Sequence, residues 1–86
     1  MKQFDYTIKD PIGIHARPAG NLAALAKSFK DSTITITKGD MTVKLGQLMK
    51  VMSMGIKCGD TVRIGVEGPD EEKVAAAIED FLKNNL

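Results

Sequence analysis

Apolar and polar residues alternate with a period of two in four separate stretches of the chain. In the first of them, residues 3–9, polar side chains separate Phe4, Tyr6 and Ile8. This alternation is typical of a strand that buries one face. The other predicted strands are residues 32–37, 41–45 and 60–67. The second and third are joined by the turn residues K-G-D, which predicts a hairpin.

Three further stretches have helical spacing. Apolar residues recur every three or four positions between Ala16 and Phe29, and lysines follow near the end. Residues 46–55 are apolar but short, which predicts a short helix. A proline and three acids after Gly68 are typical of a helix start. The apolar stripe of this last helix consists of Val74, Ile78, Phe81 and Leu82.

The order of these elements, β-α-β-β-α-β-α, defines the expected fold. Each strand has only one apolar face, so one face of the sheet is covered and the other is open. We therefore expect an α+β protein, an open-faced β-sandwich in which three helices cover one face of a four-stranded antiparallel sheet. A chain of 86 residues has room for one core, so a single domain is predicted over residues 1–86.

Composition narrows the function classes. Twelve basic and eleven acidic side chains give a net charge of +1, and only four aromatic residues are present, which disfavours nucleic-acid binding. The chain has no signal-like start and no apolar run of the ~20 residues that cross a bilayer, so a cytoplasmic protein without membrane insertion is expected. Cys58 is the only cysteine and His15 the only histidine, too few for a zinc site. We expect no metal and no cofactor.

The sequence I-G-I-H-A-R-P-A-G at residues 12–20 places His15 at the predicted start of a helix. Free amide groups and the helix dipole bind anions there, and they favour the neutral, nucleophilic imidazole. Arg17 can add a cationic fork for phosphoryl oxygens. These residue types also suit a histidine that only caps the helix or lies on the surface. No acid occurs within five residues after His15, so no triad is indicated.

Three motifs carry a resemblance to a known family. They are G-I-H-A-R-P-A at 13–19, L-M-K-V-M-S-M-G-I at 48–56 and E-G-P-D-E at 67–71. With them the chain resembles the HPr family of histidine-containing phosphocarriers in the bacterial sugar phosphotransferase system. The resemblance implies that His15 is phosphorylated on Nδ1 by phosphorylated enzyme I and passes the group to sugar-specific IIA domains. It also implies that Arg17 is the active-centre arginine and that the amides of Ala16 and Arg17 hold the phosphoryl oxygens.

The resemblance further implies a docking surface on the first two helices around the histidine. Its expected contact residues are Gly20, Ala24, Lys27, Leu48, Met49 and Met52. Methionine is flexible and polarizable, which suits a surface that must fit several partners in turn. We expect Met49 and Met52 to be exposed with Leu48, whereas Val51 and Met54 are expected in the core. A monomer is expected, because one face must be presented to successive partners.

One position departs from the family pattern. Gln47 stands where many members carry the serine that a regulatory kinase phosphorylates, and glutamine has no hydroxyl. We therefore predict that this regulation is absent and that Ser53 does not replace it. Gly46 is expected to weaken the start of the second helix.

Two other functions compete with the carrier. One is a regulatory HPr-like paralogue that binds a transcription factor or an enzyme and uses His15 phosphorylation as a switch. The other is a small interaction module in which His15 is never phosphorylated.

Overall fold

The computed structural model describes residues 2–14 and 16–86. The elements in this part of the chain follow the predicted order. The strands are β1 (Lys2–Thr7), β2 (Thr33–Lys38), β3 (Met41–Lys44) and β4 (Thr61–Glu67), and the helices are α1 (Ala16–Ser28), α2 (Leu48–Ser53) and α3 (Glu71–Asn85). The predicted elements are therefore confirmed, and the ends of the predicted strands differ from the observed ones by at most two residues.

The four strands form one antiparallel sheet in the order β1-β4-β2-β3. The register places core side chains opposite one another, as in Tyr6 with Val62 and Ile34 with Val66. Because side chains alternate across a strand, this register keeps all apolar positions on one face. β4 occupies an inner position and pairs with both β1 and β2.

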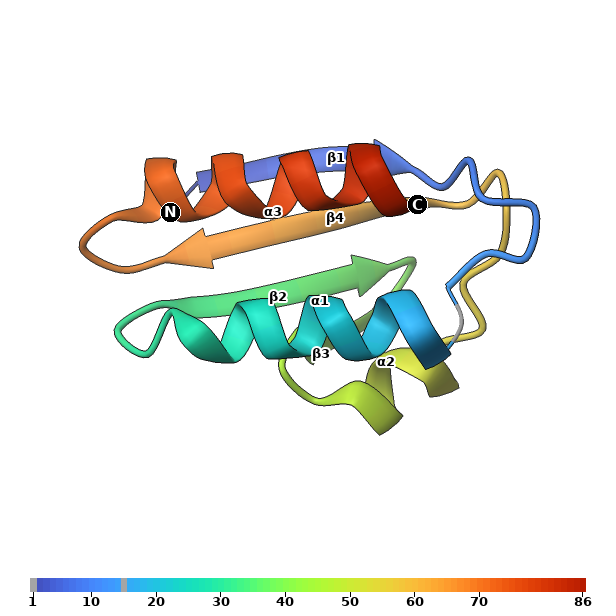
Figure 1. Ribbon diagram of the computed structural model, residues 1–86, viewed down its shortest axis with the longest axis horizontal. Coiled ribbons are helices and arrows are strands. Elements are labelled where there is room, and N and C mark those ends of the chain that lie inside the picture. The colour runs from blue at the N-terminus through green and yellow to red at the C-terminus, as the bar shows by residue number, and fades with distance from the viewer. Residues whose placement is uncertain (1, 15) are drawn as a thin grey trace.

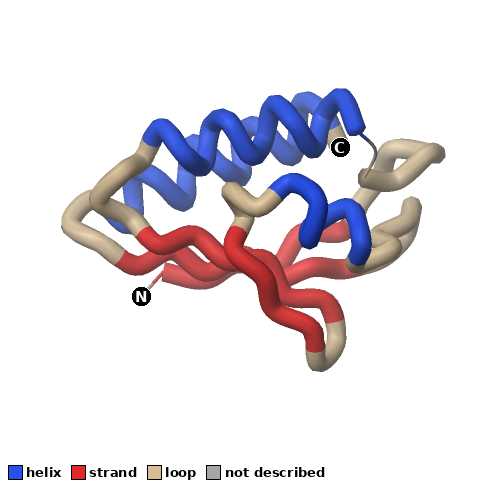
Figure 2. Tube along the Cα trace, turned by 90° about the horizontal axis from the view of Figure 1, so that it is seen from below, coloured by secondary structure: helices blue, strands red, loops and turns tan. Residues whose placement is uncertain are grey.

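All three helices lie on the same side of the sheet (Figure 2). α3 runs along β1 and β4, whereas α1 lies over β2 (Figure 1). The short α2 contacts α1 and β3, close to the start of α1. The open-faced sandwich expected from the strand pattern is therefore confirmed.

The core lies between the helices and the covered face of the sheet. Ile36, Ile64, Ile78 and Leu82 are completely buried. The Tyr6 hydroxyl donates a buried hydrogen bond of 3.0 Å to the Leu82 carbonyl, which ties β1 to α3. Burial of such side chains supplies most of the stability of a small domain.

The opposite face of the sheet is polar. The hydroxyls of Thr7 and Thr61 are 2.9 Å apart, and Arg63 donates to Asp5 at 2.9 Å. This ion pair raises the pKa of Arg63, mainly through the hydrogen bond to Asp5. The open face thus carries cross-strand pairs rather than an apolar patch.

Candidate functional site

The N-terminus of α1 is the centre of the candidate site. The helix begins at Ala16, so His15 occupies the preceding chain position and lies outside the described residues. The first four amide N–H groups of a helix have no intrahelical acceptor. Pro18 has no amide N–H, so it adds no donor here. The first turn contains no acidic side chain that would compensate the positive end of the dipole. The geometry of this helix end therefore suits an anion.

Arg17 lies in this first turn and is exposed. Its side chain makes no ion pair or hydrogen bond with any described residue. Ala16 beside it is also exposed, whereas Pro18 and Ala19 are buried and anchor the turn on the core. The guanidinium can therefore reach an anion at the helix end without giving up another partner.

The segment before α1 is held by a tight turn. The Ile12 amide donates to the Asp10 carboxylate at 2.9 Å, and the Gly13 amide donates to the Asp10 carbonyl at 2.9 Å. An aspartate side chain that bonds two residues ahead is a common turn device. The chain therefore reverses after β1 in a defined conformation and leads directly into the helix.

Gly13 locks this turn against the segment after α2. Its φ of +83° lies in the left-handed region, and a Cβ there would stand 2.6 Å from the Ile56 carbonyl oxygen. The next amide, that of Ile14, donates to the same carbonyl at 3.1 Å. The sequence indicated a turn at Gly13, and the structure confirms it. The contact with Ile56 has no signal in the sequence.

The segment after α2 is itself fixed by Asp60. Its carboxylate accepts from the Lys38 ammonium at 2.8 Å and from the Lys57 amide at 2.9 Å. Lys38 also donates to the Gly55 carbonyl at 3.1 Å. The hydrogen bond from Lys38, followed by that from Lys57, lowers the pKa of Asp60 below its ordinary value. This small network supports the carbonyl on which the turn before α1 rests.

The expected docking residues on α1 follow one side of the helix. Ala24 and Lys27 are exposed and Gly20 is half-buried, at spacings of four and three that place them in one row with Arg17. A Cβ at Gly20 would meet no atom within 4 Å, so the surface there is open. Gly20 and Ala24 leave a flat surface between the long side chains of Arg17 and Lys27.

The expected docking residues on α2 divide by exposure. Met49 is 77% exposed and Met52 is 37% exposed, whereas Leu48 is half-buried. Val51 and Met54 are buried in the core. The predicted split between surface and core methionines is confirmed, and Leu48 is less exposed than expected.

Ile12 adds an apolar side chain that sequence reasoning missed. It is 70% exposed and lies in the turn before α1. A single isoleucine beyond the end of the alternating strand pattern gives no sign of which side it faces. Ile12 thus joins Met49 and Met52 among the large apolar side chains that are exposed in the described part of the chain.

The expectation for Gly46 was wrong in its reason. α2 begins at Leu48 with Gln47 as N-cap, so Gly46 lies outside the helix and its low helix propensity does not apply. A Cβ at Gly46 would instead stand 3.2 Å from Cγ of Lys27. The side chain of Gln47 makes no hydrogen bond that would cap the start of α2.

Ser53 is exposed, and its hydroxyl donates to the Lys50 carbonyl at 2.7 Å.

Residues 2–14 and 16–86 contain no group of three side chains that could hold a metal ion. Among the same residues, no helix has the length and apolar character needed to cross a membrane. Cys58 is exposed in the loop before β4, with Sγ 3.8 Å from the Lys9 carbonyl.

Comparisons with known proteins agree with this geometry. A family model described as "PTS HPr component phosphorylation site" matches residues 2–84. The phosphocarrier protein HPr of Mycoplasma genitalium is 40% identical over 85 residues, which cover 99% of this chain and 97% of the relative. A crystal structure of HPr from Thermoanaerobacter tengcongensis superposes with a TM-score of 0.91 at 34% identity, covering 98% of this chain and 93% of that one.

A histidine-containing phosphocarrier protein of Mycoplasma also superposes with a TM-score of 0.91, at 36% identity, over 96% of this chain and 93% of that one. These likenesses extend over the whole described fold, and they define the class of the protein as a phosphocarrier of the phosphotransferase system rather than a catalyst. The chain belongs to the HPr family.

Proposed function

We propose that this protein accepts a phosphoryl group on His15 from phosphorylated enzyme I and passes it to sugar-specific IIA domains. In this reaction Nδ1 of the neutral imidazole forms the new P–N bond while the bond to the donor breaks. The observation that carries the proposal is the N-terminus of α1, which begins one residue after His15 and has no acid in its first turn. The family membership supports the same chemistry.

Arg17 and the first amides of α1 have distinct tasks in this proposal. The amides of Ala16 and Arg17 donate hydrogen bonds to the phosphoryl oxygens at the positive end of the helix. The Arg17 guanidinium, exposed and without an ion pair among the described residues, adds charge-assisted bonds. Both interactions strengthen as charge gathers on the transferring group, so they favour transfer as well as binding.

Exposed and half-buried residues along α1 and α2 form the proposed contact surface for both partners. On α1 this surface comprises Gly20, Ala24 and Lys27, and on α2 it comprises Leu48, Met49 and Met52. Partners that dock in turn must use the same atoms, and the unbranched methionines can adapt to each. We further propose that the protein works as a cytoplasmic, single-domain monomer of residues 1–86, and that Gln47 removes control by a serine kinase.

The test is transfer from enzyme I with phosphoenolpyruvate, followed by intact mass and phosphorus NMR. We expect one acid-labile phosphoryl group with a phosphohistidine signal, absent in His15→Ala. No transfer from an enzyme I that phosphorylates another HPr would contradict the carrier function and favour the regulatory alternative. A His15→Ala protein that is still phosphorylated would contradict the assignment of the residue.

Arg17→Ala should slow transfer without abolishing it. One charge-assisted contact is worth about 1.5–3 kcal/mol, which corresponds to roughly a tenfold to hundredfold lower rate. The matched control is Arg63→Ala, which removes the same charge from the open face of the sheet. Equal rates for the Arg17 and Arg63 variants in a quenched-flow transfer assay would refute the role given to Arg17.

A further inference from the structure

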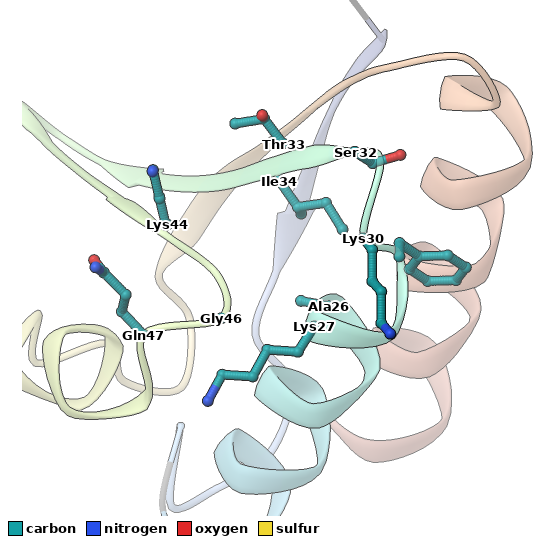
Figure 3. A pocket seen from close by; sticks show the side chains of 10 residues that line it. Ala26, Lys27, Lys30, Ser32, Thr33, Ile34, Lys44, Gly46 and Gln47 are labelled. Carbon is teal, nitrogen blue, oxygen red and sulfur yellow. The ribbon is translucent and has the colours of Figure 1, made fainter.

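A pocket of about 310 Å³ lies at the opposite end of α1 from the proposed phosphorylation site. Its walls come from the end of α1, the loop that follows, β2, and the segment between β3 and α2 (Figure 3). The lining residues are Ala26, Lys27, Phe29, Lys30, Ser32, Thr33, Ile34, Lys44, Gly46 and Gln47. This volume is at the lower end of the range for small-molecule sites.

All charged side chains that line the pocket are positive. Three lysines line it and no acidic residue does, although the whole chain has a net charge of only +1. Lys27, Lys30 and Lys44 make no ion pair with any described residue. Their ammonium groups are spread around the rim (Figure 3), and their flexible stems allow them to close on an anion.

The end of α1 explains only part of this charge. The negative end of the helix dipole attracts cations, which accounts for Lys27 and for Lys30 just beyond the last turn. Lys44 belongs to β3 and is placed opposite Thr35 by the strand register, independently of that helix. A strand residue therefore completes a cationic rim that the helix alone would not build.

The remaining lining residues complement a phosphate ester. Ala26 and Ile34 are buried and form an apolar floor, while Ser32, Thr33 and Gln47 are neutral polar residues of the lining. Gly46 keeps the mouth open, because a Cβ there would stand 3.2 Å from Cγ of Lys27. A ligand that fits has a dianionic head for the rim and a small carbon body for the floor.

We propose that this pocket binds a small phosphate monoester, with its phosphate among Lys27, Lys30 and Lys44 and its carbon body on the apolar floor. The ligand is bound unchanged, so the proposal stands apart from phosphoryl transfer on His15. Lys27 belongs both to this pocket and to the proposed docking surface. An occupied pocket would therefore engage a side chain that partners are expected to contact.

The test is an NMR titration of the ¹⁵N-labelled full chain with glycerol 2-phosphate, with sodium chloride at equal ionic strength as reference. We expect saturable shifts at the amides of Lys44, Gly46 and Gln47. Lys30→Gln combined with Lys44→Gln should weaken binding roughly twofold to thirtyfold, the effect of removing two exposed charge contacts. Lys83→Gln makes a matched control, because this exposed lysine in the last turn of α3 lies outside the pocket.

The outcomes separate the alternatives. Shifts confined to residues 16–20 would place the anion at the start of α1 and overturn the proposal. Shifts that sodium chloride reproduces, or an affinity unchanged in the double lysine variant, would overturn it as well. Inorganic phosphate should bind more weakly than glycerol 2-phosphate, and equal affinities would refute the contribution of the apolar floor.

Discussion

Gly13→Ala should destabilise the protein more than any turn-glycine substitution that meets open space. At φ +83° an L-residue costs roughly 1–2 kcal/mol. The new Cβ would also stand 2.6 Å from the Ile56 oxygen and 2.7 Å from the Lys57 Cα, both backbone atoms that move only with their segment. Such overpacking typically costs about 1–3 kcal/mol. The free energy of unfolding should therefore fall by about 2–5 kcal/mol, summing both terms.

Gly59→Ala separates the two contributions. Gly59 has a φ of +90°, but a Cβ there meets no atom within 4 Å, so only the backbone term applies. Urea unfolding followed by circular dichroism gives both free energies. The Gly13 variant should be the less stable by about 1–3 kcal/mol, roughly 4–24 °C in Tm. Equal losses in the two variants would refute the claim that the turn before α1 is locked against the segment after α2.

Two further predictions concern single bonds described above. Tyr6→Phe should lower the free energy of unfolding by only about 1 kcal/mol in urea titrations, because the Leu82 carbonyl still accepts from the Leu86 amide at 2.8 Å; a loss above about 3 kcal/mol would refute this. Asp60→Asn should be less stable than the unmodified chain at neutral pH. Since Lys38 lowers the pKa of Asp60, this difference should shrink as the pH falls below the ordinary value of 3.8 and vanish below the lowered pKa of the folded state. A difference independent of pH would contradict the ion pair.

The sequence was sufficient to predict the helices and strands and the face that each of them buries. The alternation around Ile34 and Ile36 and the helical spacing around Leu22 predict which side chains are buried, because the direction of each side chain follows from local backbone geometry. No local pattern in the sequence predicts the strand order β1-β4-β2-β3. It depends on which edges meet in space, and residues far apart in the chain decide that.

The candidate site divides in the same way. The helix start at Ala16 could be predicted, because Ala16, Arg17 and Pro18 are adjacent in the sequence and their effects on a helix start are local. The contacts that support the site could not be predicted from the sequence. Gly13 rests on Ile56 across more than forty residues, and the exposure of Ile12 depends on where the turn faces. The Gly46 prediction failed because the helix begins two residues later than the glycine.

The inner position of β4 has a consequence for biosynthesis. β1 is made first, yet its partner in the sheet is β4, which ends only at Glu67. Without β4, β1 has no partner in the sheet and only the β2–β3 hairpin can pair. Pairing over such a separation in sequence is slow compared with local structure. We therefore expect the four-stranded sheet to be completed only when β4 pairs with both β1 and β2.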